Sequence, residues 1–262
     1  MIELYHNAVS TCSQKVRLVL AHKGLEFTSH EIDLISGGQH HPDYVKLNPN
    51  HVVPTLAHQG QTLIESTLIN EYLDETFPDI PMMPNVPAQR HAARLWTKLL
   101  DEKIHPVTAT VTFAIGPRSL LLLQPEEVRE QHINAIPNTV ARAARRSVIE
   151  LGVKAPEFAR AMREMLKLLD SMETALTSRN WLASDSFTLA DAAVLPYVLR
   201  LDALAMTPLI HARSKVARWY TRVQALPAYK IAVTQWTPEF VSQLFRANGE
   251  AVWREVEDLL NE

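Results

Sequence analysis

The chain has 262 residues, of which 47% are hydrophobic and 21% charged, so it can bury a full core as one large domain or two small ones. Its formal net charge of −3 provides no global field to recruit nucleic acid or an anionic membrane. A single cysteine, Cys12, excludes an internal disulfide and a cysteine-rich zinc site, and it suits a reducing compartment.

The amino terminus has neither a basic segment nor a long apolar run, and the apolar run Leu120 to Leu123 is far shorter than a membrane span. We therefore expect a cytoplasmic protein without membrane or nucleic-acid partners. The eleven histidines show no ligand spacing of the HExxH kind, so no metal site is predicted.

Helical and extended patterns alternate over the first 77 residues. The pattern predicts strands at Ile2–Tyr5, Glu26–Leu34, Val53–Ala57 and Thr62–Ile64, and helices ending at Gly24, starting at His41-Pro42, and running from Ser66 to Pro78. The order β-α-β-α-β-β-α is typical of a thioredoxin-like unit.

Four prolines between residues 78 and 87 predict a linker, and the remainder of the chain is helical in pattern. We therefore expect an α/β thioredoxin-like domain at 1–78, a linker at 79–87 and an all-α domain at 88–262. Near 117–156 prolines interrupt the pattern, which indicates a partly helical insertion that carries the basic residues Arg142, Arg145 and Arg146. Such a cluster is most often a solvated face, and contact with an anionic substrate is the alternative.

Three short motifs carry possible chemistry. By composition alone, a trans proline at a strand start is the commoner interpretation of Pro54, whereas a cis Val53-Pro54 bond would let the Val53 main chain pair with an extended peptide. Ser66 is suited to cap a helix whose first N–H groups bind a carboxylate, and Glu65 can pair with an ammonium group; a plain helix cap is the alternative.

The third motif is the run of small polar residues from Ser10 to Ser13. The positive end of a helix dipole favours a thiolate, and a hydroxyl that donates to the thiolate lowers its pKa further. Ordinary helix capping is again the alternative.

In their order and spacing these motifs resemble the glutathione transferase family. Val53-Pro54-Thr55-Leu56 is similar to the family's cis-proline loop, Glu65-Ser66 to its γ-glutamyl motif, and Phe187 to Asp191 to the capping box of its helical domain. The resemblance implies the glutathione transferase fold, glutathione as cosubstrate, detoxification chemistry on a small apolar electrophile, and a homodimer, with the apolar stripe from Leu95 to Ile104 as a possible contact.

The run from Ser10 to Leu20 is similar to serine-type members, which makes Ser10 the expected catalytic residue and Ser13, with Thr11, its rival. Cys12 does not align with the nucleophile of cysteine-type members, but a glutathione-dependent reductase using Cys12 is one alternative. A non-catalytic adaptor and a ligand carrier are others.

The glycyl end of the expected glutathione site departs from the family pattern. The family has Gly and then Lys or Gln where this chain has His51 and Val52, and a valine side chain cannot donate a hydrogen bond. His40 or His51 could compensate, unless both are ordinary exposed histidines. Residues 94–156 also partly resemble the bacterial β-etherase branch, which uses glutathione to displace an aryl-ether oxygen.

Overall fold

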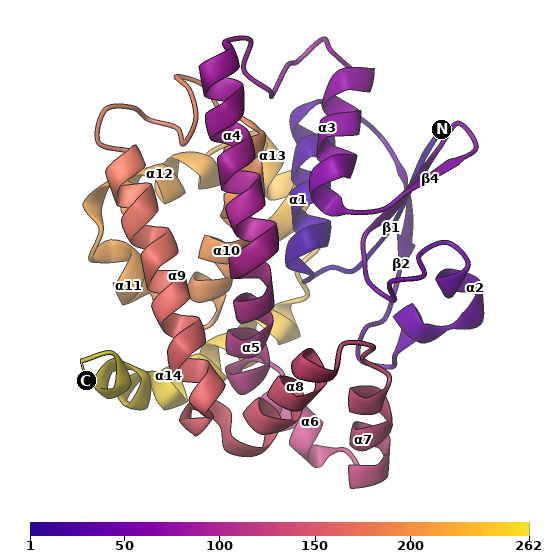
Figure 1. The fold of residues 1–262 in the computed structure, drawn as a ribbon, viewed down its shortest axis with the longest axis vertical. Helices are drawn as coiled ribbons and strands as arrows, with labels where there is room; N and C mark the ends of the chain where they lie inside the picture. Colours follow the sequence, from indigo (N-terminus) through magenta and orange to yellow (C-terminus); the bar gives the residue numbers. More distant parts are fainter. Residues whose placement is uncertain (262) are drawn as a thin grey trace. The chain divides into compact units, whose positions relative to one another are not determined.

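The computed structural model describes residues 1–261, and its amino-terminal part is a four-stranded mixed sheet with helices on both faces (Figure 1). The elements are β1 (Ile2–His6), α1 (Thr11–His22), β2 (Thr28–Glu31), the 3₁₀ turn η1 (Gly38–His40), α2 (Pro42–Val45), β3 (Thr55–His58), β4 (Gln61–Leu63) and α3 (Ser66–Thr76). The predicted thioredoxin-like order is confirmed.

The sheet has the strand order β2-β1-β3-β4, with β1 parallel to β2 and the other neighbours antiparallel. The parallel pair needs a crossover, and α1 supplies it. Side chains of β1 are alternately buried and half-buried, as the period of a strand with one core face requires. The strand predicted at Glu26–Leu34 is shorter, Thr28–Glu31, because the chain turns away after Glu31.

Helices α1 and α3 pack together on one side of the sheet, and α2 lies on the other (Figure 1). The core of this layer is apolar, with Leu4, Leu18, Leu20, Leu56 and Leu73 fully buried. Helix α1 ends at His22, and Gly24, two residues later, has a φ of +66°, in the left-handed region that glycine adopts without strain. The helix end predicted at Gly24 therefore lies within two residues of the observed one.

Residues after 86 are helical, as predicted. The helices are α4 (Pro87–Leu99), η2 (Leu100–Ile104), α5 (His105–Ile115), α6 (Arg118–Leu123), α7 (Glu126–Asn134), α8 (Thr139–Leu151), η3 (Gly152–Lys154), α9 (Pro156–Ala175), α10 (Leu189–Ala203), α11 (Thr207–His211), α12 (Ser214–Gln224), α13 (Pro227–Tyr229), η4 (Lys230–Thr234) and α14 (Glu239–Asn261). The segment predicted as a partly helical insertion contains α6, α7 and α8.

A π-helical turn, η2, joins α4 to α5 directly before Pro106. A proline inside a helix has no N–H and its ring clashes with the carbonyl four residues earlier, so the wider turn accommodates it. Leu100 and Ile104 are buried in this stretch, whereas Leu95 is 53% exposed. Of the stripe from Leu95 to Ile104, Leu100 and Ile104 are therefore core residues that no partner subunit can contact.

The capping motif before α10 is present with one difference. The Asp191 carboxylate accepts the Thr188 N–H at 3.0 Å, which is the predicted return to the cap. The Thr188 hydroxyl also donates to Asp191, at 2.8 Å, instead of accepting from the helix. Asp191 further accepts the Leu182 N–H and the Trp219 Nε1–H, each at 2.9 Å, so four donors surround this buried carboxylate.

The chain forms two compact units. The first unit comprises Met1–Thr97, Arg179–Pro196 and Trp219–Pro238, and the second comprises Lys98–Ser178, Tyr197–Arg218 and Glu239–Glu262. The first unit therefore contains the thioredoxin-like part and also helical segments from late in the chain. The domain limits drawn from the sequence, 1–78 and 88–262, stay a prediction.

Candidate functional site

Ser10 is the N-cap of α1. Its backbone is extended, with φ −65° and ψ 125°, and its Oγ accepts the N–H of Ser13 at 3.3 Å. Because the hydroxyl accepts in this contact, its own proton remains available to a ligand. The side chain is half-buried, so a ligand can reach it beside the positive end of the α1 dipole.

The other members of the run are less accessible, except Cys12. Thr11 is 8% exposed and Ser13 is fully buried. The Oγ of Ser13 accepts the N–H of Asn7 at 3.2 Å, which fixes the loop that leads into Ser10. Cys12 is half-buried. The structure thus separates the rival hydroxyls by access, which the sequence could not do.

The peptide bond between Val53 and Pro54 is cis, as the family resemblance implies and against the commoner trans form. The preceding loop is held from the protein side, because the Tyr44 hydroxyl and the Asn48 amide donate to the Val52 carbonyl at 2.6 and 2.9 Å. The main-chain N–H and C=O of Val53 make no hydrogen bond to any residue from 1 to 261. They are therefore available to a ligand.

Helix α3 begins at Ser66, and Glu65, not Ser66, occupies the N-cap position. The reason is the backbone of Glu65, whose φ of +69° lies outside the helical region. The exposed carboxylate of Glu65 accepts only a long hydrogen bond, 3.4 Å from the Asn50 amide. The buried Thr67 hydroxyl, one position into α3, has no hydrogen-bond partner in residues 1–261. The Glu65 carboxylate and the Thr67 hydroxyl at the start of α3 can therefore form further hydrogen bonds.

His40 and His51 form a pair near the same loop. Their Nδ1 atoms lie 3.0 Å apart, and the Gln39 amide nitrogen is 3.0 Å from His40 Nε2. One imidazole nitrogen must donate and the other accept, so the two rings are linked rather than independent. Val52 is 50% exposed and offers only an apolar side chain.

A buried arginine, which the sequence pattern does not identify as a site residue, contacts the loop before Ser10. Arg17, 1% exposed, donates to the carbonyls of Asn7 (2.9 Å), Ala8 (2.6 Å) and Ala232 (2.8 Å) and to His6 Nδ1 (3.0 Å). Its guanidinium carbon lies 5.4 Å from the centre of a Trp236 ring. Arg17 therefore fixes the main chain that precedes Ser10.

Burial shifts the pKa of both partners in this contact. Burial lowers the pKa of Arg17 to about 10, although Glu31 acts in the opposite direction. Burial, with Arg17 and His30 next, lowers the pKa of His6 to about 4, so His6 is neutral at physiological pH. Since Arg17 donates to Nδ1, the proton of His6 sits on Nε2, 2.8 Å from the Ser29 hydroxyl.

Two family models match the chain: the glutathione S-transferase N-terminal domain over residues 9–76 and the C-terminal domain over 120–227. Protein LigF from Sphingobium sp. strain SYK-6 is 31% identical over 72% of this chain and 75% of its own length. The chain belongs to the glutathione S-transferase family.

Other relatives agree with this assignment. Glutathione S-transferase 3 from Zea mays is 29% identical over 88% of this chain and 93% of its own. Among solved structures, β-etherase LigF from Sphingobium sp. strain SYK-6 superposes with a TM-score of 0.80 at 27% identity, covering 88% of this chain and 98% of that one. The chain is thus a glutathione S-transferase family enzyme with the glutathione transferase fold.

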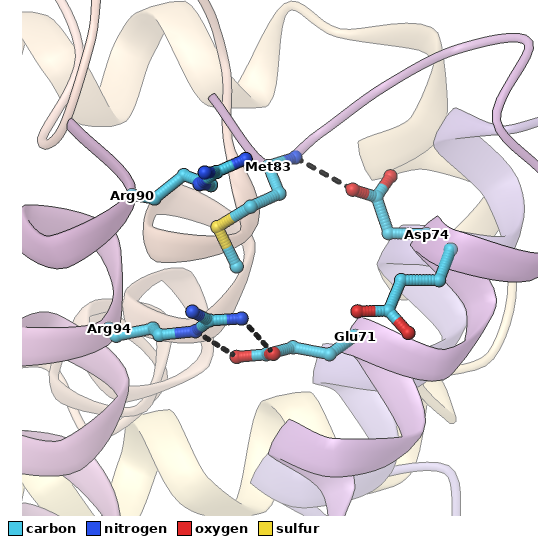
Figure 2. A pocket seen from close by; sticks show the side chains of 6 residues that line it. Glu71, Asp74, Met83, Arg90 and Arg94 are labelled. Atoms are coloured by element: carbon cyan, nitrogen blue, oxygen red, sulfur yellow. Dashed lines mark hydrogen bonds and ion pairs between the residues drawn. The ribbon is translucent and has the colours of Figure 1, made fainter. Parts of the chain in front are cut away.

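A charged recess of about 230 Å³ is lined by residues of which none is a predicted site residue (Figure 2). Glu71, Asp74, Glu75, Met83, Arg90 and Arg94 line it. Arg94 donates twice to Glu71, at 3.1 and 2.8 Å. Asp74 accepts the N–H groups of Met82 and Met83 and pairs with Lys23 at 2.7 Å. Much of the charge in this recess is therefore compensated by other groups of the protein.

No helix within residues 1–261 is long and apolar enough to cross a membrane. No group of three or more His, Cys, Asp and Glu side chains there could hold a metal ion.

Proposed function

We propose that this chain is a serine-type glutathione transferase in which Ser10 hydrogen-bonds the glutathione sulfur, and that the thiolate displaces a leaving group from, or adds to, a small electrophile. The observation that carries the proposal is the state of Ser10: accessible, at the N-terminus of α1, and accepting from Ser13 so that its proton can be donated.

Glutathione supplies the nucleophilic sulfur, so the protein needs none of its own. The Ser10 O–H and the α1 dipole both stabilise negative charge on that sulfur and lower the pKa of the thiol. Ser13 serves as support instead, because its buried hydroxyl holds the Asn7 N–H.

The γ-glutamyl half of glutathione fits the groups left open near α3. The unpaired N–H and C=O of Val53, next to Pro54, can pair with the cysteinyl main chain like an added strand. The Ser66 N–H at the start of α3 can bind the α-carboxylate, and Glu65 can accept from the ammonium group.

The glycyl end of glutathione has to be bound without the side-chain donor that the family pattern has at the position of Val52. Val52 cannot donate from its side chain, and its carbonyl is already bonded to Tyr44 and Asn48. We assign the glycyl carboxylate to the linked pair His40 and His51, where an imidazole N–H can donate.

The homodimer is also part of the proposal. In the first unit, Leu68 on α3 and Leu95 on α4 are 62% and 53% exposed, which suits an isologous contact. Sedimentation at micromolar concentration should give about twice the chain mass of 29.6 kDa, and a species at the chain mass itself would reject the dimer.

A second candidate reaction is β-aryl-ether cleavage, in which an aryloxide is the leaving group. The superposition on β-etherase LigF favours it. A screen of glutathione consumption against aryl ethers, haloalkanes and isomerisable α,β-unsaturated ketones should separate it from conjugation of other electrophiles.

The test of the main proposal is Ser10→Ala with Ser13→Ala as its matched control. We expect Ser10→Ala to lower kcat roughly 100-fold, about the loss of one transition-state hydrogen bond, while glutathione binding stays largely intact. Full activity in Ser10→Ala together with its loss in Ser13→Ala would overturn the assignment.

Two other outcomes would favour other functions. A glutathione adduct on Cys12, detected by mass spectrometry during turnover, would indicate a reductase. Glutathione binding without consumption across the whole screen would indicate a binding protein, either an adaptor or a ligand carrier, and competition by apolar dyes would identify the carrier.

A further inference from the structure

Tyr44, on the short helix α2, has a hydroxyl that contacts both sides of the loop around Pro54. The residue is 5% exposed. Its hydroxyl donates to the Val52 carbonyl at 2.6 Å and lies 2.9 Å from the Thr55 Oγ1. Val52 comes before the Val53-Pro54 bond, and Thr55 comes after it as the first residue of β3. One side chain therefore connects the two flanks of the loop.

The Asn48 side chain bonds to the same two oxygen atoms. Its Nδ2 donates to the Val52 carbonyl at 2.9 Å and to the Thr55 Oγ1 at 3.1 Å. The main-chain N–H of Asn48 donates to the Tyr44 carbonyl at 2.9 Å, so these two residues are fixed to each other. Asn48 is 1% exposed and Thr55 is fully buried, so water does not compete for these bonds.

The protons of this network can be assigned one by one. The Val52 carbonyl can only accept, so it takes the single hydroxyl proton of Tyr44. The Thr55 hydroxyl must then donate to the Tyr44 oxygen, and the two amide protons of Asn48 go to Val52 and Thr55. Burial raises the pKa of the Tyr44 phenol, although hydrogen bonds with Thr55 and Asn48 act in the opposite direction. The hydroxyl therefore keeps its proton at neutral pH, and every donor of the network is used.

The position of the Val52 carbonyl decides where the next N–H group points. The peptide bond between Val52 and Val53 is planar and trans, so the Val52 carbonyl and the Val53 N–H lie on opposite sides of it. Because the carbonyl is held towards Tyr44 and Asn48, the N–H points away from them. This N–H has no acceptor in residues 1–261, and it is the donor that the proposed function gives to the glutathione main chain.

We propose that Tyr44 is a positioning residue for glutathione, because its bond to Val52 aims the Val53 N–H at the cysteinyl carbonyl of the tripeptide. The inference rests on the proposed function for the identity of the ligand. Tyr44 acts through the main chain of the loop and does not touch the sulfur. Its hydroxyl therefore sets the affinity for glutathione, whereas Ser10 acts on the reactivity of the thiol.

The binding arm of the test uses Tyr44→Phe, which removes the hydroxyl and keeps the ring. Tyr72→Phe is the matched control, since Tyr72 on α3 of the same unit also has a bonded hydroxyl, 2.8 Å from His58 Nδ1. Glutathione is titrated calorimetrically into the full-length protein. We expect the Kd to rise about fivefold in Tyr44→Phe, as for one weakened hydrogen bond, and to stay unchanged in Tyr72→Phe. An unchanged Kd in Tyr44→Phe, or an equal rise in both variants, would overturn the inference.

Two substitutions of Thr55 separate the hydroxyl network from the volume of the side chain. Thr55→Val replaces the hydroxyl by a methyl group, but Tyr44 can still donate to Val52, so we expect a smaller rise in Kd of about threefold. Thr55→Ser keeps the hydroxyl and should bind glutathione like the wild-type protein. Binding by Thr55→Ser that is no tighter than binding by Thr55→Val would show that the network does not hold the loop, and would overturn the inference.

Kinetics with glutathione and an activated chloroarene separate positioning from a role in the chemical step. We expect Tyr44→Phe to raise the KM for glutathione by the same factor as the Kd and to leave kcat at saturating glutathione unchanged. Ser10→Ala is expected to do the reverse. A fall of kcat in Tyr44→Phe without a change in KM would place Tyr44 in the activation of the thiol and would overturn the positioning role.

The inference and the proposed function fail in different ways. If the wild-type protein binds glutathione without consuming it, the proposed function fails and the titrations alone decide the role of Tyr44. If Ser10→Ala behaves as expected and Tyr44→Phe binds like the wild-type protein, only the inference fails. Absence of glutathione binding in the wild-type protein would overturn both. Should Tyr44→Phe not fold, the comparison of Thr55→Val with Thr55→Ser gives the answer.

Discussion

Arg17 in the first unit is buried and Arg145 in the second unit is half-buried, and the hydrogen bonding of the two arginines differs. In the first unit, Arg17 is enclosed and donates to three main-chain carbonyls and to His6. In the second unit, Arg145 is stacked on Phe113 without an acceptor in residues 1–261. Burial lowers the pKa of both to about 10, so burial alone does not distinguish them.

The two arginines differ in whether their N–H donors have acceptors within the protein. Arg17 finds all of its acceptors within the chain, which makes it part of the folded structure and a positioning residue for the loop before Ser10. The donors of Arg145 have no acceptor in residues 1–261. The contrast predicts that removing Arg17 costs much stability, whereas removing Arg145 costs little.

The largest effect is expected for Arg17→Met. The substitution leaves the carbonyls of Asn7, Ala8 and Ala232 without their donor. Each buried group left unpaired costs about 1–3 kcal/mol, partly offset by removal of a desolvated charge, so we expect the free energy of unfolding to fall by about 3–5 kcal/mol. Urea denaturation monitored by circular dichroism measures it.

Arg17→Lys sharpens the same comparison. A single ammonium cannot reach the acceptors that the guanidinium fork spans, so this charge-conserving variant should also be destabilised, by more than about 1 kcal/mol. Wild-type stability in Arg17→Lys would show that charge, and not the set of directed hydrogen bonds, is what matters at this position.

The next largest effect is the pH dependence that His6 gives to the free energy of unfolding. His6 has a pKa of about 4 in the folded protein, against 6.5 unfolded, so between these values the unfolded state binds more protons. Its contribution to stability is therefore complete above pH 6.5 and is lost as pH falls towards 4. The loss amounts to about 3 kcal/mol, since one pKa unit corresponds to about 1.4 kcal/mol.

His6→Asn is the matched variant, because its amide oxygen can replace Nδ1 as the acceptor for Arg17 without titrating in this range. We expect the pH dependence of its unfolding free energy between pH 4 and 7 to be flatter than that of the wild-type protein. His22, whose pKa burial and Lys23 also lower, is retained in both proteins, so its contribution cancels in the comparison. Parallel curves would contradict the role given to His6.

The sequence predicted the features that local patterns determine. The alternation of strands and helices up to residue 77, the helix end near Gly24 and the return of Asp191 to Thr188 follow from periodicity and end signals within a few residues. The cap of α3 fell one position away, on Glu65, because a positive φ at a glutamate has no local signal.

The two arginines show where such prediction stops. Arg17 stands inside an apolar run, and one of its acceptors, Ala232, lies 215 residues later in the chain. The residues near Arg17 in the sequence therefore do not predict its hydrogen bonds. Arg145 looked like a member of a solvated basic cluster. Only the fold shows that Arg142 and Arg146 have protein partners while Arg145 faces a ring of another helix.

The smallest expected effect on stability is that of Arg145→Met. No hydrogen bond to the protein is lost, and a methionine can keep its contact with the Phe113 ring through its sulfur. Removal of the desolvated charge and loss of the cation–π contact nearly cancel, so the free energy of unfolding should change by less than about 1 kcal/mol. The same urea denaturation series measures it beside Arg17→Met. A loss as large as that in Arg17→Met would mean that Arg145 stabilises the fold, and the distinction between the two arginines would fail.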